Sequence, residues 1–255
     1  MKKYELTAEF IEQWGKKLFR IKALISFGSV EAGELGGYVE KEDNLAQDGD
    51  AWVCGNAKVY GDARVCGNAW VCGDAEVCGD AEVCGNAKVC GDAEVCGNAR
   101  VCGDAEVCGN AWVCGDAEVC GNAEVCGNAK VCGNAEVCGN AKVCGNAKVC
   151  GNARVCGDAK VCGNAKVCGN AEVCGDAEVC GNADYLLIGR IGSRFSFTTF
   201  FKNKDKGITV SCGCFLGTIA EFRAKVTDTH GNNKHAKMYN LAADMAELQI
   251  LGEEH

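Results

Sequence analysis

Small apolar residues recur every six positions along more than half of the chain. From Ala51 to Ala183 the repeating unit is Ala-x-Val-Cys-Gly-Asn or Ala-x-Val-Cys-Gly-Asp, where x is mostly Lys, Arg, Glu or Trp. Alanine and valine are two residues apart, so they share one face of an extended segment while x faces the other way. The Gly-Asn or Gly-Asp pair that follows favours a bend. Each unit is therefore predicted to be one short strand and one corner, and neighbouring units must stack to bury their apolar faces.

The unit Val-Cys-Gly-Asp-Ala-Lys at residues 155–160 resembles the hexapeptide repeat of left-handed parallel β-helices. The resemblance implies an all-β solenoid in which three hexads form one triangular coil, so that residues 18 apart lie above one another. The charges at x agree with this coil length. At a spacing of 18, opposite charges outnumber like charges, as in Arg64 and Glu82, whereas at a spacing of 12 like charges prevail. We expect a rod of a little over seven coils, roughly 35 Å long.

The sequences on either side of the repeat predict caps that cover its exposed strand edges. We divide the chain into an N-terminal cap (1–44), the hexapeptide-repeat β-helix (45–184) and a small α+β C-terminal cap (185–255). The first cap has turn signals at residues 14–15 and 36–37. The second is expected to contain strands at 185–188, 195–201 and 208–215. A capping box at 218–221 then opens a helix to about residue 230, and a second helix runs from about 234 to 251.

Residues 33–53 (GELGGYVEKEDNLAQDGDAWV) and 207–237 (GITVSCGCFLGTIAEFRAKVTDTHGNNKHAK) lie in or next to these caps. Both stretches resemble a family of uncharacterised hexapeptide-repeat proteins found mainly in phage and prophage genomes. That family has no established activity and often carries tyrosine where this chain has cysteine. The resemblance implies an architecture and a phage-related origin, but no reaction.

Composition bears on where the protein works and what it binds. The first residues, MKKYELTAEFIEQWGKK, lack the apolar segment of a secretion signal, and no stretch approaches the roughly 20 apolar residues of a membrane span. We therefore expect a cytoplasmic protein whose 23 cysteines are reduced rather than a disulfide scaffold. The net charge of −9 argues against nucleic acid or an anionic membrane as partner. No feature identifies a protein partner.

If alanine and valine face inward, the cysteines face outward near the corners. Tyr60 supports this orientation, because it takes the cysteine position in one repeat and a phenol ring would overpack the interior. Stacking at 18 residues then sorts the thiols into three surface columns. The first column is Cys54, Cys72, Cys90, Cys108, Cys126, Cys144, Cys162 and Cys180. The second begins at Tyr60 and continues with Cys78, Cys96, Cys114, Cys132, Cys150 and Cys168. The third is Cys66, Cys84, Cys102, Cys120, Cys138, Cys156 and Cys174.

Columns of thiols about 4.8 Å apart indicate soft-metal chemistry. Zinc prefers four tetrahedral ligands, which a single column does not supply well. Two neighbouring thiolates suit an ion that accepts near-linear coordination, which favours Cu(I), and by the same reasoning Ag(I), Hg(II) and Cd(II). No cofactor is expected to be required for folding. Disulfides between adjacent coils are possible, although in-register side chains must lean together to form them.

Two other interpretations of the thiols remain open. Tandem repeats grow by duplication, so the cysteines can be one choice copied many times in a structural or interaction protein of phage or prophage origin. Exposed thiols in number also make a redox buffer possible. The two remaining cysteines, Cys212 and Cys214, are expected on one face of a strand in a packing role.

Many hexapeptide β-helices are acyltransferases, and the sequence argues against this activity here. Such enzymes use a histidine base and loops that interrupt the coils. The repeat has no insertion, and the three histidines, His230, His235 and His255, all follow it. We therefore expect a protein that is not an enzyme. Trp52 and Trp70 lie one coil apart at x, where stacked aromatic rings would stabilise neighbouring coils.

Overall fold

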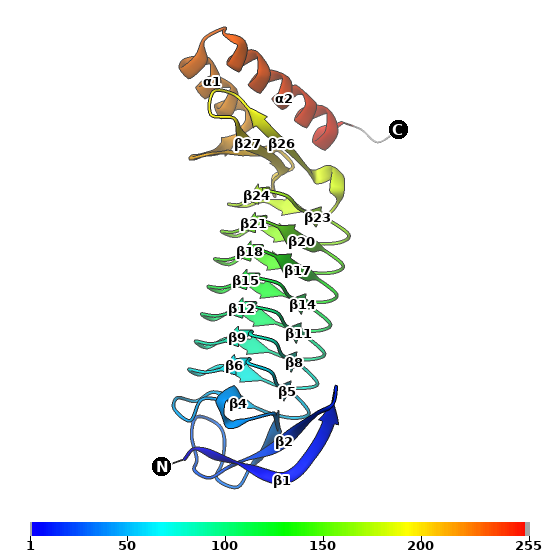
Figure 1. Ribbon diagram of the computed structural model, residues 1–255. Helices are drawn as coiled ribbons and strands as arrows, with labels where there is room; N and C mark the ends of the chain where they lie inside the picture. The colour runs from blue at the N-terminus through cyan, green and yellow to red at the C-terminus, as the bar shows by residue number, and fades with distance from the viewer. Residues whose placement is uncertain (1, 253–255) are drawn as a thin grey trace.

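The computed structural model describes residues 2–252 as a rod of stacked coils with a cap at each end (Figure 1). Three parallel sheets run along the rod, and each coil contributes one strand to each of them. The pairings join residues 18 apart, such as Val65 with Val83. The predicted β-solenoid with 18-residue coils is confirmed. One sheet has eight strands, so the rod is about eight coils long, slightly more than the sequence predicted.

The strands of the repeat are short, most of them two residues. The first sheet contains β4 (Trp52–Val53), β7 (Trp70–Val71), β10 (Lys88–Val89), β13 (Glu106–Val107), β16 (Glu124–Val125), β19 (Lys142–Val143), β22 (Lys160–Val161) and β25 (Glu178–Val179). The second contains β5 (Lys58–Val59), β8 (Glu76–Val77), β11 (Glu94–Val95), β14 (Trp112–Val113), β17 (Lys130–Gly133), β20 (Lys148–Gly151) and β23 (Lys166–Val167). The third contains β6 (Arg64–Val65), β9 (Glu82–Val83), β12 (Arg100–Val101), β15 (Glu118–Val119), β18 (Glu136–Val137), β21 (Arg154–Val155) and β24 (Glu172–Val173).

The interior of the rod consists of alanine and valine, as the alternation predicts. Val101 and Ala105, for example, are completely buried. Glycine follows each cysteine of the repeat, and between stacked coils the corner leaves little room for a side chain. Gly103 has φ +73°, and a Cβ atom there would lie 3.0 Å from the backbone N and O of Gly121 in the next coil. Backbone conformation and close stacking therefore both exclude a side chain.

At x, at cysteine and at the corner Asn or Asp, the backbone N–H groups donate to the coil that follows. The N–H of Glu82 donates to the carbonyl of Ala99, and the N–H of Cys84 donates to the carbonyl of Val101, each at 2.9 Å. Each coil thus donates to the coil that follows it. The first coil leaves carbonyl groups without donors and the last leaves N–H groups without acceptors, and an unpaired backbone group is costly if it is buried.

The N-terminal cap begins with an antiparallel hairpin, β1 (Tyr4–Gln13) and β2 (Lys16–Ala23), whose turn lies at residues 14–15 as predicted. The predicted turn at residues 36–37 is wrong. Gly36 and Gly37 lie inside β3 (Leu35–Val39), and a Cβ on either glycine would lie 2.5 Å from a backbone oxygen of the first coil. These glycines allow close packing rather than a bend. Because β3 pairs in parallel with β5, the stacking already begins before residue 45.

Side-chain donors from the N-terminal segment satisfy the free carbonyls at this end. The Lys3 ammonium is buried and donates to the carbonyls of Ala51 (2.9 Å), Asp48 and Gly49 (both 3.3 Å). Asn44, in a short 3-10 helix (η1, Glu42–Asn44), donates its amide to the carbonyl of Ala63 at 2.8 Å. The cap therefore supplies the hydrogen-bond donors that a preceding coil would otherwise supply.

The C-terminal cap is a four-stranded antiparallel sheet with two helices (Figure 1). Its elements are η2 (Asn182–Asp184), β26 (Tyr185–Ile191), β27 (Ser196–Lys202), β28 (Ile208–Cys212), β29 (Phe215–Thr218), α1 (Ile219–His230) and α2 (Lys234–Leu251). Both helices and the capping box are confirmed, since the Thr218 hydroxyl accepts from the Glu221 N–H. The single strand predicted at 208–215 is wrong. Gly213, at φ +62°, lies in a turn between β28 and β29.

The C-terminal cap offers acceptors where the N-terminal cap offers donors. The Thr199 hydroxyl accepts from the N–H of Glu172 at 3.0 Å, and the side-chain Oδ1 of Asn182 accepts from the N–H of Lys166 at 2.9 Å. The Asp184 carboxylate accepts from the N–H of Cys180 at 2.9 Å. The two caps thus supply partners for backbone groups that are left free at opposite ends of the rod. In the described part of the chain, neither helix has the length and apolar character needed to cross a bilayer.

Candidate metal-binding columns

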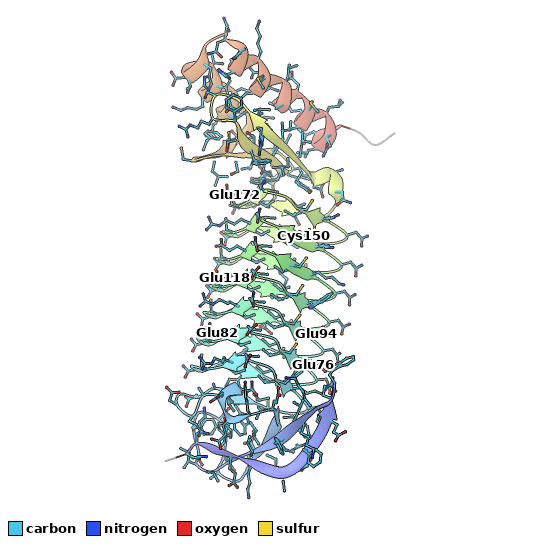
Figure 2. All side chains as sticks on the ribbon, in the orientation of Figure 1. Glu76, Glu82, Glu94, Glu118, Cys150 and Glu172 are labelled. Atoms are coloured by element: carbon cyan, nitrogen blue, oxygen red, sulfur yellow. A yellow bond between two sulfur atoms is a disulfide. The ribbon has the colours of Figure 1, made fainter. Side chains whose placement is uncertain are left out.

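The cysteines of the repeat follow their strands directly, so the registers of the three sheets arrange them in three columns. Cys132 pairs with Cys150 in the extended register of β17 and β20. In the first column the Cα atoms of Cys162 and Cys180 are 4.5 Å apart. The side chains project from the coils (Figure 2, where Cys150 is labelled). The columns therefore have the composition and spacing that the sequence predicts.

The thiols are less exposed than a surface position implies. Nearly all the column cysteines are half-buried, and Cys174 is 7% exposed. Each lies against the corner backbone and against the cysteines one coil away; the Cys54 thiol, for example, lies 3.6 Å from the carbonyl oxygen of Val71. The columns are therefore half-buried rows of thiols rather than fully exposed ones. The outward orientation at this position agrees with Tyr60, whose hydroxyl donates to Glu76 at 3.2 Å.

Hydrogen bonds between neighbouring thiols of a column shift the pKa values of both partners. The Cys54 thiol donates a hydrogen bond to Cys72, which lowers the pKa of Cys72 to about 6 and raises that of Cys54. In the second column the Cys78 thiol donates to Cys96, and this bond lowers the pKa of Cys96 to about 6. The indole N–H of Trp112 contributes to the same effect, because it donates to the Cys96 sulfur at 3.1 Å. At these two positions a thiolate is available near neutral pH.

Other thiols in the columns hold their protons more firmly. Burial raises the pKa of Cys90 to about 11 and that of Cys120 to about 12. In both cases the negative charge of neighbouring cysteines adds to the effect. A metal ion bound between such thiols must displace their protons, so occupancy of the columns should depend on pH.

One adjacent pair is joined covalently. Cys162 and Cys180, the last two members of the first column, form a disulfide. The sequence analysis allowed such bonds between coils and expected reduced thiols. At this pair, at the C-terminal end of the first column, the structure has a disulfide instead of the expected free thiols.

Carboxylates join the thiols at two places in the third column. One group consists of Cys120, Glu136 and Cys138, and the other of Cys156, Glu172 and Cys174. In each group the ligand atoms all lie within 4.8 Å of one another. The repeat explains both groups, because Glu at x and the cysteine two residues later point to the same side of a strand. The sequence analysis considered only sulfur ligands and missed these carboxylates.

The other residues singled out in the sequence lie away from the columns or have structural roles. Trp52 is not exposed beside Trp70; it is completely buried, with its ring centroid 5.4 Å from that of Phe27. The N-terminal segment that covers the first coil explains this, and nothing in the repeat itself signals it. Cys212 ends β28 and accepts from the Thr198 hydroxyl at 3.1 Å, while Cys214 is exposed in the turn, so they do not share a strand face.

The histidines lie in the C-terminal cap. His230 ends α1 and His235 lies in the first turn of α2, with their ring centroids 5.8 Å apart. His230 also stacks on Tyr239. His255 lies outside the described residues. The two described histidines thus belong to the contact between the helices.

The corner residues form a second ladder that the sequence analysis missed. Asn110 donates its side-chain amide to the side-chain oxygen of Asn128, and Asn128 donates to Asn146, both at 3.1 Å. An asparagine also donates to an aspartate where the next coil carries one, as Asn98 does to Asp116 at 2.7 Å. Comparing residues 18 apart at this position would have revealed the ladder. It stiffens the corners beside the cysteine columns.

Comparison with known proteins bears on the repeat alone. A family model described as YdcK Beta solenoid repeat matches residues 57–73, a stretch just short of one coil. No curated protein matches the chain. The match agrees with the observed solenoid and concerns architecture. The chain is a cysteine-rich β-solenoid.

Proposed function

We propose that this protein is a non-enzymatic solenoid whose cysteine columns bind soft, thiophilic metal ions, with Cu(I) as the expected ion. Ag(I), Hg(II) and Cd(II) belong to the same chemical class and are expected to compete. The single observation that carries the proposal is the in-register stacking of cysteines on successive coils, as in Cys132 and Cys150. Two sulfurs held one strand spacing apart can bind one ion between them with little rearrangement.

The acid–base properties of the columns support the proposal. Cys72 and Cys96 have pKa values lowered to about 6 by neighbouring donors, so each offers a thiolate to start metal binding. The rigid coil also lowers the entropic cost of bringing ligands together, because the thiols are ordered before the ion arrives. If no thiolate is shared, the columns hold at most about ten ions, or fewer while Cys162 and Cys180 are joined.

A second candidate is a structural or interaction protein that makes no use of the thiols. Its origin would be phage or prophage, as the resemblance of residues 33–53 and 207–237 implies. One observation favours it. Tyr60 replaces cysteine in the second column while the neighbouring strands β5 and β8 keep their register. The coil therefore does not need a thiol at this position, and the repeated cysteine can be a duplicated residue without a ligand.

Anaerobic loading with Cu(I) separates the two candidates. The protein is reduced, loaded with Cu(I), challenged with a strong Cu(I) chelator and analysed for metal by mass spectrometry, with free thiols counted in parallel. We expect several ions per chain to survive the challenge and most thiols to be blocked. Fewer than one ion per chain, with nearly all of the 23 thiols still free in the thiol count, would refute metal binding and favour the structural candidate.

Replacement of one column by serine tests the assignment of the ligands. The variant carries Cys→Ser at the six cysteines of the second column: Cys78, Cys96, Cys114, Cys132, Cys150 and Cys168. We expect it to lose about a third of the bound Cu(I), because the three columns act independently. The matched control replaces Cys212 and Cys214, which lie outside the columns, and should lose none. Equal losses in both variants would mean that the thiols bind metal without regard to the columns.

A further inference from the structure

The two groups of cysteine and glutamate in the third column differ in what surrounds the carboxylate. At the group of Cys120, Glu136 and Cys138, the Arg154 guanidinium lies 3.4 Å from the Glu136 carboxylate and 3.9 Å from the Cys138 sulfur. The guanidinium already neutralises the negative charge of the Glu136 carboxylate, which would otherwise attract a metal ion. The group is therefore a poor metal site.

The group of Cys156, Glu172 and Cys174 has the opposite character. Within the described residues, Glu172 makes no ion pair with a lysine or arginine, and its carboxylate accepts from the Ser211 hydroxyl at 3.1 Å. Cys174 is 7% exposed, and Cys156 packs against the core. Two sulfurs and a carboxylate oxygen thus converge in a half-buried place, and the nearby Arg154, whose charge reaches both sulfurs, forms its ion pair with Glu136 rather than with Glu172.

This group lies at the junction of the rod and the C-terminal cap. Glu172 belongs to β24, the last strand of the third sheet, and in Figure 2 it lies at the upper end of the coils, beneath the cap. Ser211 comes from β28 of the cap, and Thr199 of β27 accepts from the Glu172 N–H at 3.0 Å. The cap closes the site from above, and its Ser211 hydroxyl donates to the carboxylate of the group.

We propose that Cys156, Cys174 and Glu172 bind one divalent ion of borderline softness, Zn²⁺ or Cd²⁺, and that this ion fastens the C-terminal cap to the rod. Two thiolates and one carboxylate are ligands that zinc accepts, and the oxygen of Ser211 or of a water molecule supplies the fourth ligand. The site differs from the proposed Cu(I) columns in needing a carboxylate, and it stands even if the columns bind no Cu(I).

The first test locates the first equivalent of Zn²⁺ on the full, reduced chain. After one equivalent is added, accessible thiols are alkylated and the protein is cleaved with trypsin. Cys156 then lies alone in the peptide 155–160, and Cys174 lies in the peptide 167–190. We expect these two thiols to be the best protected in the chain. Protection spread evenly over the columns would overturn the proposal.

Two matched variants test the role of the carboxylate. Glu172→Gln should weaken binding of the first Zn²⁺ at least tenfold, whereas Glu136→Gln, two coils earlier in the same column, should leave it unchanged. Equal effects of the two substitutions would overturn the site. Co²⁺ provides a second readout, since its visible absorption reports tetrahedral sulfur coordination and should be lost in Glu172→Gln only.

Hydrogen exchange tests the link to the cap. Zn²⁺ should slow exchange in β27 and β28 of the wild-type chain and not of Glu172→Gln; unchanged exchange in the wild type would overturn the fastening role. The Cu(I) stoichiometry of the same variant separates this zinc site from the proposed Cu(I) binding by the columns. Glu172→Gln should retain the Cu(I) content of the columns, because two-coordinate binding needs no carboxylate. Either proposal can therefore fail while the other holds.

Discussion

The N–H of Glu172 donates to the side-chain hydroxyl of Thr199 at 3.0 Å, whereas one coil earlier the N–H of Arg154 donates to the carbonyl of Ala171 at 2.9 Å. A side chain of the cap thus replaces the carbonyl that a further coil would supply. At the other end of the rod the roles of donor and acceptor are reversed, because the Lys3 side chain donates to carbonyls of the first coil. The stability of the rod therefore depends on a few polar side chains at its ends as well as on its apolar interior.

Replacement of Thr199 by valine should loosen the C-terminal cap. Valine keeps the shape of threonine but leaves the Glu172 N–H without its acceptor, which costs about 1–3 kcal/mol of unfolding free energy. The measurement is the urea unfolding midpoint, together with hydrogen exchange in β24 and β27. Thr229→Val on the exposed surface of α1 is the control and should change neither. Equal shifts in both variants would contradict a capping role for Thr199.

Replacement of Lys3 by methionine should destabilise the N-terminal end. The ammonium of Lys3 is buried and donates to three backbone carbonyls, which methionine leaves unpaired, so we expect a loss of about 2–4 kcal/mol. Lys2→Met removes a neighbouring cation whose ion pair with Glu42 is exposed, and it should cost less than about 1 kcal/mol. Thermal and urea unfolding of the two variants measure the difference. A Lys3→Met protein as stable as Lys2→Met would show that Lys3 is dispensable.

Replacement of Gly103 by alanine should cost more than the positive φ alone accounts for. Gly15 and Gly103 both have φ near +75°, but only at Gly103 would the added methyl meet backbone atoms, those of Gly121 at 3.0 Å. Gly15→Ala is therefore the control for conformational strain of about 1–2 kcal/mol. We expect Gly103→Ala to lower the urea midpoint further than Gly15→Ala. Equal midpoints would mean that neighbouring coils separate without cost.

Alkylation should show that Cys96 reacts as a thiolate at lower pH than an ordinary cysteine. The hydrogen bonds from Cys78 and from the indole of Trp112 lower the pKa of Cys96 to about 6, so its thiolate persists until the pH falls through that value. Peptide mass spectrometry after brief iodoacetamide treatment at pH 5–9 gives the profile. Trp112→Phe removes one donor and should shift the Cys96 midpoint upward. An unchanged midpoint in this variant would refute the contribution of the indole.

The repeat could be predicted from the sequence because its physics is local. Alternation of Ala and Val fixes which face is buried, and Gly followed by Asn or Asp fixes the corner; the 18-residue coil follows from the charges and the resemblance. The ends could not be predicted in the same way. Burial of Trp52 beneath Phe27, and of Gly36 against the first coil, depends on how a non-repeating segment folds back over the rod. No periodic signal records such a contact.

The candidate site was predicted in part for the same reason. The register that creates the cysteine columns follows from the repeat, whereas burial of Cys174 depends on the cap above it. The carboxylates of Glu136 and Glu172 lie two residues before a column cysteine and were visible in the sequence as charges. Which of them is neutralised depends on where the Arg154 side chain points, and only the structure gives that direction.

The 18-residue coil also governs how a change in length affects this protein. Removing 18 residues shortens the rod by one coil and returns every end group to the side on which its partner lies. Removing six residues from the middle of the repeat instead turns the last coil and the C-terminal cap together by a third of a revolution, so that Thr199 still meets the N–H of Glu172 but the two caps no longer keep their relative orientation. The rod can therefore change length in units of six, but only a change of eighteen keeps its two ends facing the same way.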